Sequence, residues 1–335
     1  MSAGQTRVCP ADTGRIGPVP VLPVDKPLGP SSHDVVAEAR RRLGTRRVGH
    51  AGTLDPLATG VLVLLTGGAT KLSPYLTGGD KEYLAWIAFG AATATLDAEG
   101  PVVAEGDASW LTGEAVAAAL PPFLTLREQR PPAFSAVKRE GVRSYRRARQ
   151  GEEVSLPPRP AGYLSLALVG FAPVREALPA RFAADADGVW VPADSGYAPS
   201  LPATLAALPT ALVRARVRAG TYLRAFARDL GAALGVPAHL AGLVRTRAGR
   251  IGLDRACSLS DLAGAGGMPA SEALAYPCIR LDAEAARRVR LGQRPPASFQ
   301  GRVGLLDPDG RLAAVAEAAA GHVRLLRVWT EDEAD

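Results

Sequence analysis

Asp55 is the one carboxylate in the densest cluster of loop-forming residues of the chain. It lies in the stretch GHAGTLDPLATGVLVLL, residues 49–65, where three glycines, one proline and two threonines surround it. Glycine permits positive φ angles and a close approach of a ligand to the backbone, while Pro56 stiffens the turn directly after the acid. The spacing therefore predicts an acid fixed on a rigid turn, which fits either a capping role or a role in chemistry.

The same block resembles the catalytic motif of the TruB family of pseudouridine synthases. That motif reads GHxGxLDPxAxGxL, and all of its fixed positions are present in residues 49–62. Further stretches resemble the family in the same order: VDKPLGPSSHD at 24–34, DKEYLAWIAFG at 80–90, QRPPAFSAVKREGVRSYRRARQGEEV at 129–154 and GTYLRAFARDLGAALGVPAHLAGLVRTRAG at 220–249. The resemblance runs from about Val21 to Leu262. It implies isomerisation of the TΨC-loop uridine of tRNA, uridine-55 in tRNA numbering.

The resemblance implies a catalytic set of three residues. Asp55 is the nucleophile in a reaction that exchanges a glycosidic C–N bond for a C–C bond, so we expect no metal and no cofactor. Burial would raise the pKa of such a carboxylate, and Arg224 in GTYLRAF matches the cation that keeps it ionised. Tyr83 in KEY matches the tyrosine that stacks on the target base and helps to remove its C5 proton. Without the motif, Arg224 fits a phosphate contact or a surface charge, and Tyr83 fits the core.

Three more residues match positions around the flipped nucleotide. His50 corresponds to the histidine that fills the space left by the base, while Tyr222 and Leu243 correspond to residues that line the uracil pocket. The alternatives are a turn-stabilising hydrogen bond for His50 and ordinary core packing for Leu243. Lys26 in VDKP matches a supporting position behind the catalytic loop, with a solvated lysine as the alternative, and we leave it outside the catalytic set.

An arginine cluster lies in the segment that resembles the approach to the RNA-gripping insertion of the family: Arg139, Arg143, Arg146, Arg147 and Arg149. A helix would place Arg139, Arg143 and Arg147 on one face, where a polyanion relieves their mutual repulsion. We expect these three arginines to bind RNA, with a merely solvated basic face as the alternative.

Two features depart from the family pattern. The family usually has an aspartate between two threonines, whereas this chain reads GAATATLDAEG, with Ala94 at that position and Asp97 retained. The missing carboxylate is expected to alter the pocket without removing the nucleophile. The stretch 172–210, rich in Ala, Pro, Gly and Asp, is longer than the family needs. We expect a surface insertion there that is either inert or in contact with tRNA.

Periodicity and capping residues agree with the α+β fold that the resemblance implies, a pseudouridine synthase fold with a central mixed or antiparallel sheet flanked by helices. Buried strands are expected at 61–71 and 83–90. Helices are expected at 34–43 after Ser31 or Ser32 as N-cap, at 112–120, at 144–150, and at 222–234 before Gly235 as its stop.

A chain of 335 residues exceeds what one hydrophobic core usually organises, so we expect a main domain and a smaller one. The expected organisation is a flexible tail at 1–20, a catalytic domain at 21–276 and a small β-rich domain at 277–332. The last part resembles the PUA-like RNA-binding module that often ends bacterial members of the family.

The charge balance suits a polyanionic partner without identifying it. Lys and Arg number 39 against 33 Asp and Glu, which gives a net charge of +6 and a pI near 9.5. Only four of the 39 are lysines, so 35 are arginines, whose planar fork suits RNA. Coding bias would produce the same excess. The three cysteines are too far apart to predict a zinc site or a disulfide framework.

The longest aliphatic run, Val61 to Leu65, is too short to cross a bilayer, so we expect a cytoplasmic protein without a membrane anchor. The expected partner is the TΨC stem-loop of tRNA, and the expected state is a monomer.

Two other functions fit parts of the sequence. An RNA chaperone of the same fold would share the partner, but Asp55, Tyr83 and Arg224 favour an enzyme because a buried carboxylate near RNA phosphates would repel them. A nucleotide-dependent enzyme is disfavoured because the glycines at 60–68 match neither GxxxxGK[ST] nor GxGxxG.

Overall fold

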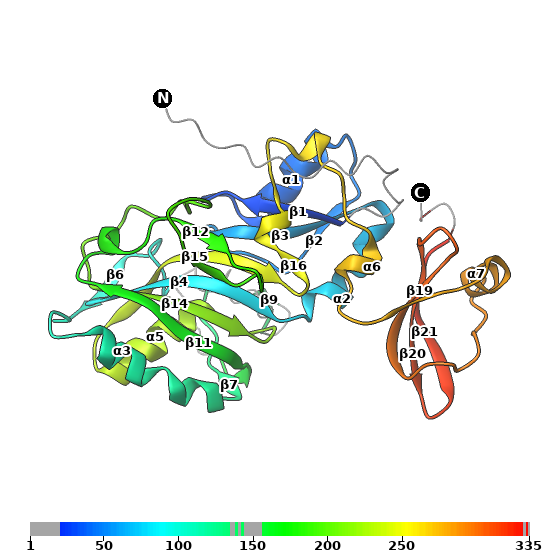
Figure 1. Cartoon of the computed structure of the whole chain (residues 1–335). Coiled ribbons are helices and arrows are strands. Elements are labelled where there is room, and N and C mark those ends of the chain that lie inside the picture. The colour runs from blue at the N-terminus through cyan, green and yellow to red at the C-terminus, as the bar shows by residue number, and fades with distance from the viewer. Residues whose placement is uncertain (1–20, 135–137, 140–141, 144–155, 331–332, 334–335) are drawn as a thin grey trace. The chain divides into compact units, whose positions relative to one another are not determined.

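The computed structural model describes residues 21–134, 138–139, 142–143, 156–330 and 333, in which strands and helices alternate irregularly as expected for an α+β chain (Figure 1). These residues form two compact units. The first contains the described parts of Met1–Asp55, Gly60–Gly79 and Arg247–Asp335, and the second contains Pro56–Thr59 and the described part of Asp80–Thr246. The chain thus passes from the first unit to the second directly after Asp55.

A mixed sheet organises the first unit. Its strand order is β2 (Val48–Ala51), β3 (Ala58–Thr66), β1 (Val21–Lys26) and β17 (Cys257–Ser258). β1 pairs antiparallel with β3 and parallel with β17. Every residue of β3 is buried, which explains its continuous apolar run. The predicted strand 61–71 is wrong beyond Thr66, because Gly67 has a φ of 51° and starts a 3₁₀ helix.

Helix α1 (Ser32–Arg42) confirms the predicted cap. The Ser31 hydroxyl accepts a hydrogen bond from the backbone N–H of Asp34, and the Asp34 carboxylate accepts one from the backbone N–H of Ser31. These two bonds form a capping box. The Ser31 hydroxyl also donates to the Asp34 carboxylate, which holds the pKa of Asp34 below its usual value.

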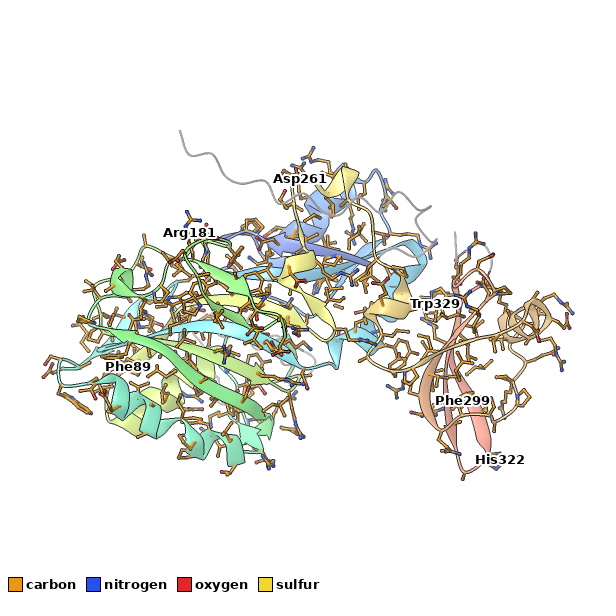
Figure 2. The ribbon with its side chains drawn as sticks, in the orientation of Figure 1. Phe89, Arg181, Asp261, Phe299, His322 and Trp329 are labelled. Atoms are coloured by element: carbon orange, nitrogen blue, oxygen red, sulfur yellow. The ribbon has the colours of Figure 1, made fainter. Side chains whose placement is uncertain are left out.

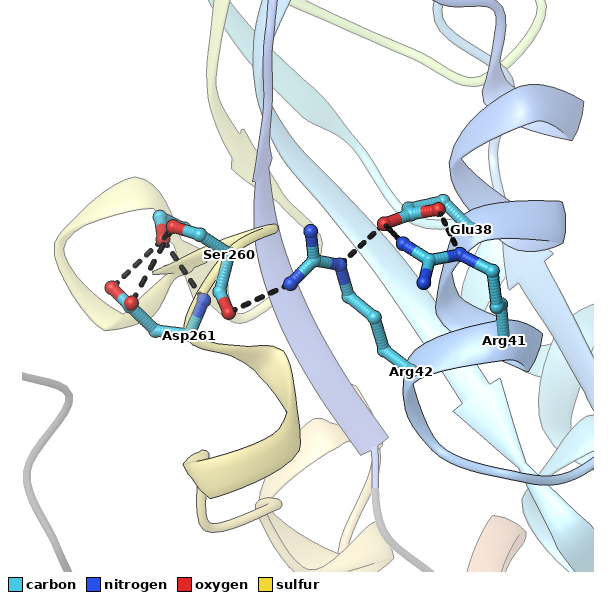
Figure 3. A network of polar contacts seen from close by, with 6 residues as sticks. Glu38, Arg41, Arg42, Ser260 and Asp261 are labelled. Atoms are coloured by element: carbon cyan, nitrogen blue, oxygen red, sulfur yellow. Dashed lines mark hydrogen bonds and ion pairs between the residues drawn. The ribbon is translucent and has the colours of Figure 1, made fainter.

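A polar network near the end of α1 fixes this helix to the segment after β17 (Figure 3). Glu38 accepts hydrogen bonds from both Arg41 and Arg42. Arg42 also donates to the Ser260 carbonyl oxygen at 3.0 Å. The adjacent Asp261 closes a turn, because its carboxylate accepts a hydrogen bond from the Ser258 hydroxyl and its backbone N–H donates to that hydroxyl.

The β-rich C-terminal region is confirmed as a four-stranded sheet ordered β18 (Cys278–Arg280), β19 (Gly301–Leu306), β20 (Leu312–Ala319) and β21 (His322–Val328). Val303 and Val289, the latter from helix α7 (Ala283–Arg290), lie in its core, against which Phe299 packs (Figure 2). Trp329 is fully buried, and its indole N–H donates to the Gly68 carbonyl oxygen at 2.9 Å.

A second set of strands organises the second unit, in the order β11 (Tyr163–Ala172), β14 (Thr210–Val217), β4 (Lys81–Phe89) and β15 (Ala238–Ala248). β14 pairs antiparallel with both β11 and β4. Helix α3 (Gly113–Ala119) packs against β11, and helix α5 (Leu223–Leu234) packs against β4. The predicted stop of α5 is confirmed, because Gly235 is its C-cap with a φ of 73°. Phe89 ends β4 as a fully buried side chain (Figure 2).

The 172–210 insertion has ordered structure of its own, in addition to the expected irregular stretches. It contains a hairpin of β12 (Phe182–Ala184) and β13 (Trp190–Pro192), and both Phe182 and Trp190 are buried.

The remaining elements are short. In the first unit they are η1 (Gly67–Leu72), α2 (Ser73–Thr77), β16 (Ile251–Gly252), η4 (Leu253–Arg255), η5 (Leu262–Gly264) and α6 (Ala270–Ala273). In the second unit they are β5 (Ala91–Thr93), β6 (Val102–Glu105), η2 (Pro121–Thr125), β7 (Glu128–Gln129), β8 (Lys138–Arg139), β9 (Val142–Arg143), β10 (Arg159–Pro160) and η3 (Arg175–Ala177). None of the described helices combines the length and the apolar composition needed to cross a bilayer.

Candidate active site

The Asp55 loop of the first unit is fixed by hydrogen bonds to the start of α1. The Ser32 hydroxyl donates to the Leu54 carbonyl oxygen at 2.9 Å and accepts from the Leu54 N–H at 2.8 Å. Both residues are buried, and Gly52 turns the chain with a φ of 87°. Leu54, the residue before Asp55, therefore has both of its backbone polar groups hydrogen-bonded. Asp55 follows it, half-buried, on a rigid turn.

Two further predicted residues lie in the first unit. The ring of His50 meets the ring of His33 edge-on, with centroids 5.5 Å apart, and its carbonyl oxygen accepts a hydrogen bond from the Ser73 hydroxyl. Lys26 is fully buried, and its Nζ donates to the Pro27 carbonyl oxygen at 2.8 Å. The alternative interpretation of Lys26 as a solvated lysine is therefore wrong, because the β1 strand carries it into the interior.

Arg224 is the centre of a buried polar network in the second unit. It lies in the first turn of α5, and its side chain is only 7% exposed. Its Nη1 donates to the Thr95 carbonyl oxygen at 3.0 Å, its Nη2 donates to the Phe134 carbonyl oxygen at 2.8 Å, and its Nε lies 3.6 Å from Oδ2 of Asp97. A planar guanidinium held in three directions is fixed in orientation, so the surface-charge interpretation is wrong.

Asp97 is held as firmly as the arginine that it contacts. It is 3% exposed, and its carboxylate accepts hydrogen bonds from the Thr95 hydroxyl and from the Glu99 backbone N–H. The adjacent Leu96 has a φ of 64°, a strained conformation for a non-glycine residue. Ala94, which replaces the usual family aspartate, is exposed, whereas the retained Asp97 is buried and contacts Arg224.

Tyr83 lies on β4 and is 8% exposed, beside two buried cations that sequence reasoning missed. Arg245, 1% exposed on the neighbouring strand β15, donates a hydrogen bond to the side chain of Tyr83, and burial lowers the pKa of this arginine. Burial also lowers the pKa of Lys81 to about 8, with the charge of Arg245 adding to the effect and Asp80 opposing it. Side chains alternate between the two faces of a strand, so Lys81 and Tyr83 lie on the same face of β4. This two-residue period is the sequence signal that could have placed Lys81 beside Tyr83.

The two uracil-pocket residues also belong to the second unit. Tyr222 is the N-cap of α5, where its backbone N–H donates to Gln129 Oε1 at 2.9 Å and its carbonyl oxygen accepts from Gln129 Nε2 at 3.1 Å. Leu243 is buried on β15. Gln129 is a third residue that sequence reasoning missed, since it contacts a residue 93 positions away along the chain.

The predicted helical face of arginines is wrong for the part that the structure describes. Arg139 belongs to β8 and Arg143 to β9, and these strands pair antiparallel with Arg139 opposite Val142. An extended backbone cannot give the i, i+4 spacing of a helix. Arg147 and the predicted helix 144–150 lie outside the described residues.

Within each unit, the structure brings together part of the predicted set. The first unit contains Asp55, His50 and Lys26, and the second contains Tyr83, Tyr222, Arg224 and Leu243. Chemically, the first offers a half-buried carboxylate on a rigid loop, and the second offers an oriented guanidinium with an aromatic ring beside buried positive charge. Among the described residues, no group of three or more His, Cys, Asp or Glu side chains is arranged as a metal site.

Known proteins share both the sequence pattern and the fold. Residues 40–182 match the family model described as TruB family pseudouridylate synthase (N terminal domain). A tRNA pseudouridine synthase B of Thermus thermophilus is 50% identical over 309 residues, covering 92% of this chain and 98% of the relative. The protein of that name from Deinococcus deserti is 49% identical over 311 residues, covering 93% and 100%.

A solved structure of a Cbf5-Nop10-Gar1 complex superposes with a TM-score of 0.65 at 23% identity, covering 93% of this chain and 86% of that chain. The relatives define a pseudouridine synthase, and the fold agrees with that class. Within that class, the chain belongs to the TruB family.

Proposed function

We propose that this enzyme converts uridine-55 in the TΨC loop of tRNA into pseudouridine, with Asp55 as its nucleophile. Pseudouridine synthesis in tRNA is the activity named for the relatives that are 49–50% identical over more than nine-tenths of the chain. The observation that carries the finer proposal is the Asp55 loop, where the complete family motif coincides with a carboxylate on a turn locked by Ser32.

The reaction is an isomerisation, so its atoms balance without a co-reactant. The bond between N1 of uracil and C1′ of ribose breaks, the ring turns over, and a bond forms between C5 and C1′. The proton on C5 is lost and N1 gains one. Asp55 holds one fragment covalently between these steps, through attack on either C6 or C1′, and is released at the end.

The other residues receive their roles from the family resemblance, and burial supports the roles of Arg224, Tyr83 and Leu243. Arg224 keeps the nucleophile ionised and oriented, and its fixed guanidinium suits that task. Tyr83 stacks on the flipped base and helps to remove the C5 proton, His50 occupies the space that the base leaves, and Tyr222 and Leu243 line the uracil pocket. Arg139, Arg143 and Arg147 bind the RNA backbone.

The domain organisation belongs to the same proposal. It consists of a tail at 1–20, a catalytic domain at 21–276 and a PUA-like RNA-binding domain at 277–332. The enzyme acts as a cytoplasmic monomer on the TΨC stem-loop.

The test is to map pseudouridine in an unmodified tRNA transcript after incubation with the wild type, Asp55→Asn and Asp309→Asn. Wild type should modify position 55 alone, in buffer containing a chelator. Asp55→Asn should lose at least about 10⁴-fold in rate while keeping its tRNA affinity, because phosphate contacts supply most of the binding. Asp309 is an exposed carboxylate of the C-terminal sheet region, so its variant is the matched control.

Three outcomes would contradict the proposal. Normal turnover by Asp55→Asn would remove the nucleophile assignment, and equal modification of other uridines would remove the site assignment. A wild type that binds and refolds tRNA without forming pseudouridine would support the RNA chaperone instead.

A further inference from the structure

We propose that the 172–210 insertion is a brace that positions the second-unit residues of the candidate site. The inference rests on the proposed function and assigns a role to a segment that the catalytic set does not explain. Four separate contacts join the insertion to strands or turns that carry site residues.

The first contact supports the strand of Tyr83. Phe182 of β12 is fully buried, and its ring meets the ring of Trp86 edge-on, with centroids 5.8 Å apart. Trp86 is 1% exposed and lies on β4, three residues after Tyr83. Because aromatic rings prefer this edge-on geometry, the pair restricts sideways movement of β4 more than small apolar side chains would.

The second contact supports β15 beside Leu243. A Cβ atom placed on Gly242 would lie 2.7 Å from Cδ2 of Leu201, so the insertion reaches the bare backbone of the strand. Glycine at this position allows that close approach.

The third contact supports the turn of Asp97. The Thr204 hydroxyl donates to the carbonyl oxygen of Ala98 at 2.9 Å. The same turn is joined to β15, because the Ala98 N–H donates to the Leu240 carbonyl oxygen and the Leu240 N–H donates to the Leu96 carbonyl oxygen, each at 3.0 Å. Thr204 therefore reinforces a turn that is already paired with the strand.

The fourth contact reaches the chain just after the candidate nucleophile. The Tyr197 hydroxyl donates to Oγ1 of Thr59 at 3.4 Å, and Thr59 is 2% exposed and four residues beyond Asp55. Tyr197 is itself fixed, because its backbone exchanges two hydrogen bonds with Phe182, at 2.8 and 2.9 Å, and its ring packs edge-on against Trp190.

The charges of the insertion argue against the alternative of a tRNA contact. Its ionisable side chains are two arginines and four acids, Arg175, Arg181, Glu176, Asp185, Asp187 and Asp194, which give a formal charge of −2. The side chain of Arg175 is 9% exposed and donates to the Pro202 carbonyl oxygen, so Arg181 is the one exposed cation of this segment (Figure 2). A net negative surface repels phosphate, whereas a brace needs only the apolar and hydrogen-bonded inner face.

The experiment removes the second, third and fourth contacts one at a time with the variants Leu201→Ala, Thr204→Val and Tyr197→Phe, followed by the triple variant. We expect each single variant to lower kcat about three- to tenfold and the triple variant about 30-fold or more, with KM for tRNA within about twofold of wild type. Asp187→Asn, at the exposed tip of the β12–β13 turn, should match wild type.

A stability control separates positioning from unfolding. Val303→Ala removes apolar contacts in the core of the C-terminal sheet and should lower the melting temperature without lowering kcat of the folded fraction. The pair Leu201→Ala and Gly242→Ala supplies a compensation test. Gly242→Ala alone should lower kcat because it collides with Leu201, and adding Leu201→Ala should restore part of the loss.

Hydrogen exchange provides a measurement that does not depend on activity. In the triple variant, the amides of Ala98 and Leu240 should exchange at least about tenfold faster, whereas Val303→Ala should leave them unchanged. A triple variant that is folded, has wild-type kcat and protects both amides would overturn the brace. A wild type without pseudouridine synthase activity would overturn the proposed function instead, and the exchange experiment would still decide the brace.

Discussion

The Asp55 loop and the Arg224 network contribute to the candidate site in different ways. The loop is shaped by backbone, through the positive φ of Gly52 and two hydrogen bonds between Leu54 and Ser32, 22 residues away. The network is shaped by side-chain charge, and the partners of Arg224 are 90 and 129 residues away. A short sequence motif can encode the Asp55 loop, whereas the Arg224 network forms only after strands and helices that are distant in sequence have packed together.

The difference also predicts how each region fails. Substitution of Asp55 changes one side chain on a scaffold that remains intact, because the loop is supported by hydrogen bonds between the Ser32 hydroxyl and the main chain of Leu54. Substitution in the Arg224 network removes the hydrogen bonds to the Thr95 and Phe134 carbonyl oxygens and the ion pair with Asp97, which costs stability as well as activity.

The sharpest test of that contrast is Arg224→Lys. An ammonium group cannot reach the Thr95 carbonyl, the Phe134 carbonyl and Asp97 together, because it lacks the planar fork of a guanidinium. We expect kcat to fall about 10²- to 10³-fold and the free energy of unfolding to fall by about 1–3 kcal/mol. Single-turnover kinetics and urea denaturation measure the two effects. Wild-type stability in this variant would mean that the network is not structural.

Asp97→Asn should have a smaller effect. The amide keeps an oxygen that can accept from the Glu99 N–H, but it loses the charge that faces Nε of Arg224 at 3.6 Å. We expect kcat to fall about tenfold with a KM for tRNA close to that of wild type. Because Ala94 is exposed, restoring the family aspartate by Ala94→Asp should not rescue the variant. A rescue would assign the orienting role to position 94.

The smallest expected effect concerns Lys81, whose substitution should raise the free energy of unfolding, whereas substitution of Arg224 should lower it. Burial lowers its pKa from 10.5 to about 8, so the unfolded chain binds this proton more tightly than the folded chain does. The resulting destabilisation is fully present below pH 8 and is relieved as the pH rises from about 8 toward 10.5.

Lys81→Met should therefore raise the free energy of unfolding at pH 7 by up to about 2 kcal/mol, and the gain should shrink toward pH 10. Urea denaturation of variant and wild type at both pH values provides the measurement. Lys71→Met is the control, because Lys71 forms an ion pair with Glu333 and its removal should give no gain. A loss of stability at pH 7 in Lys81→Met would contradict the prediction.

The sequence was sufficient for features that depend on neighbouring residues. Ser31 caps α1, Gly235 ends α5, and the apolar runs around Val61 and Trp86 form strands, since capping, positive φ and apolar patterning are local properties. The family motif also singled out Arg224, but not the partners that hold it.

Long-range features could not be predicted in the same way. Arg245 and Lys81 would be assigned to the surface from their residue type, and only neighbouring strands reveal that they are buried beside Tyr83. The hairpin that contains Arg139 and Arg143 could not be predicted, because charged residues show no apolar period. The packing of the 172–210 insertion could not be predicted either, because two isolated aromatic residues do not form a periodic sequence pattern.

The parallel pairing of β1 with β17 has a consequence for synthesis of the protein. Val24 is opposite Cys257, so one edge of the first strand stays open until a segment more than two hundred residues later has left the ribosome. At usual elongation rates this delay is on the order of 10 to 50 seconds. During that time the nascent chain exposes an apolar strand edge that can recruit other chains, and shielding by a chaperone would be most valuable then.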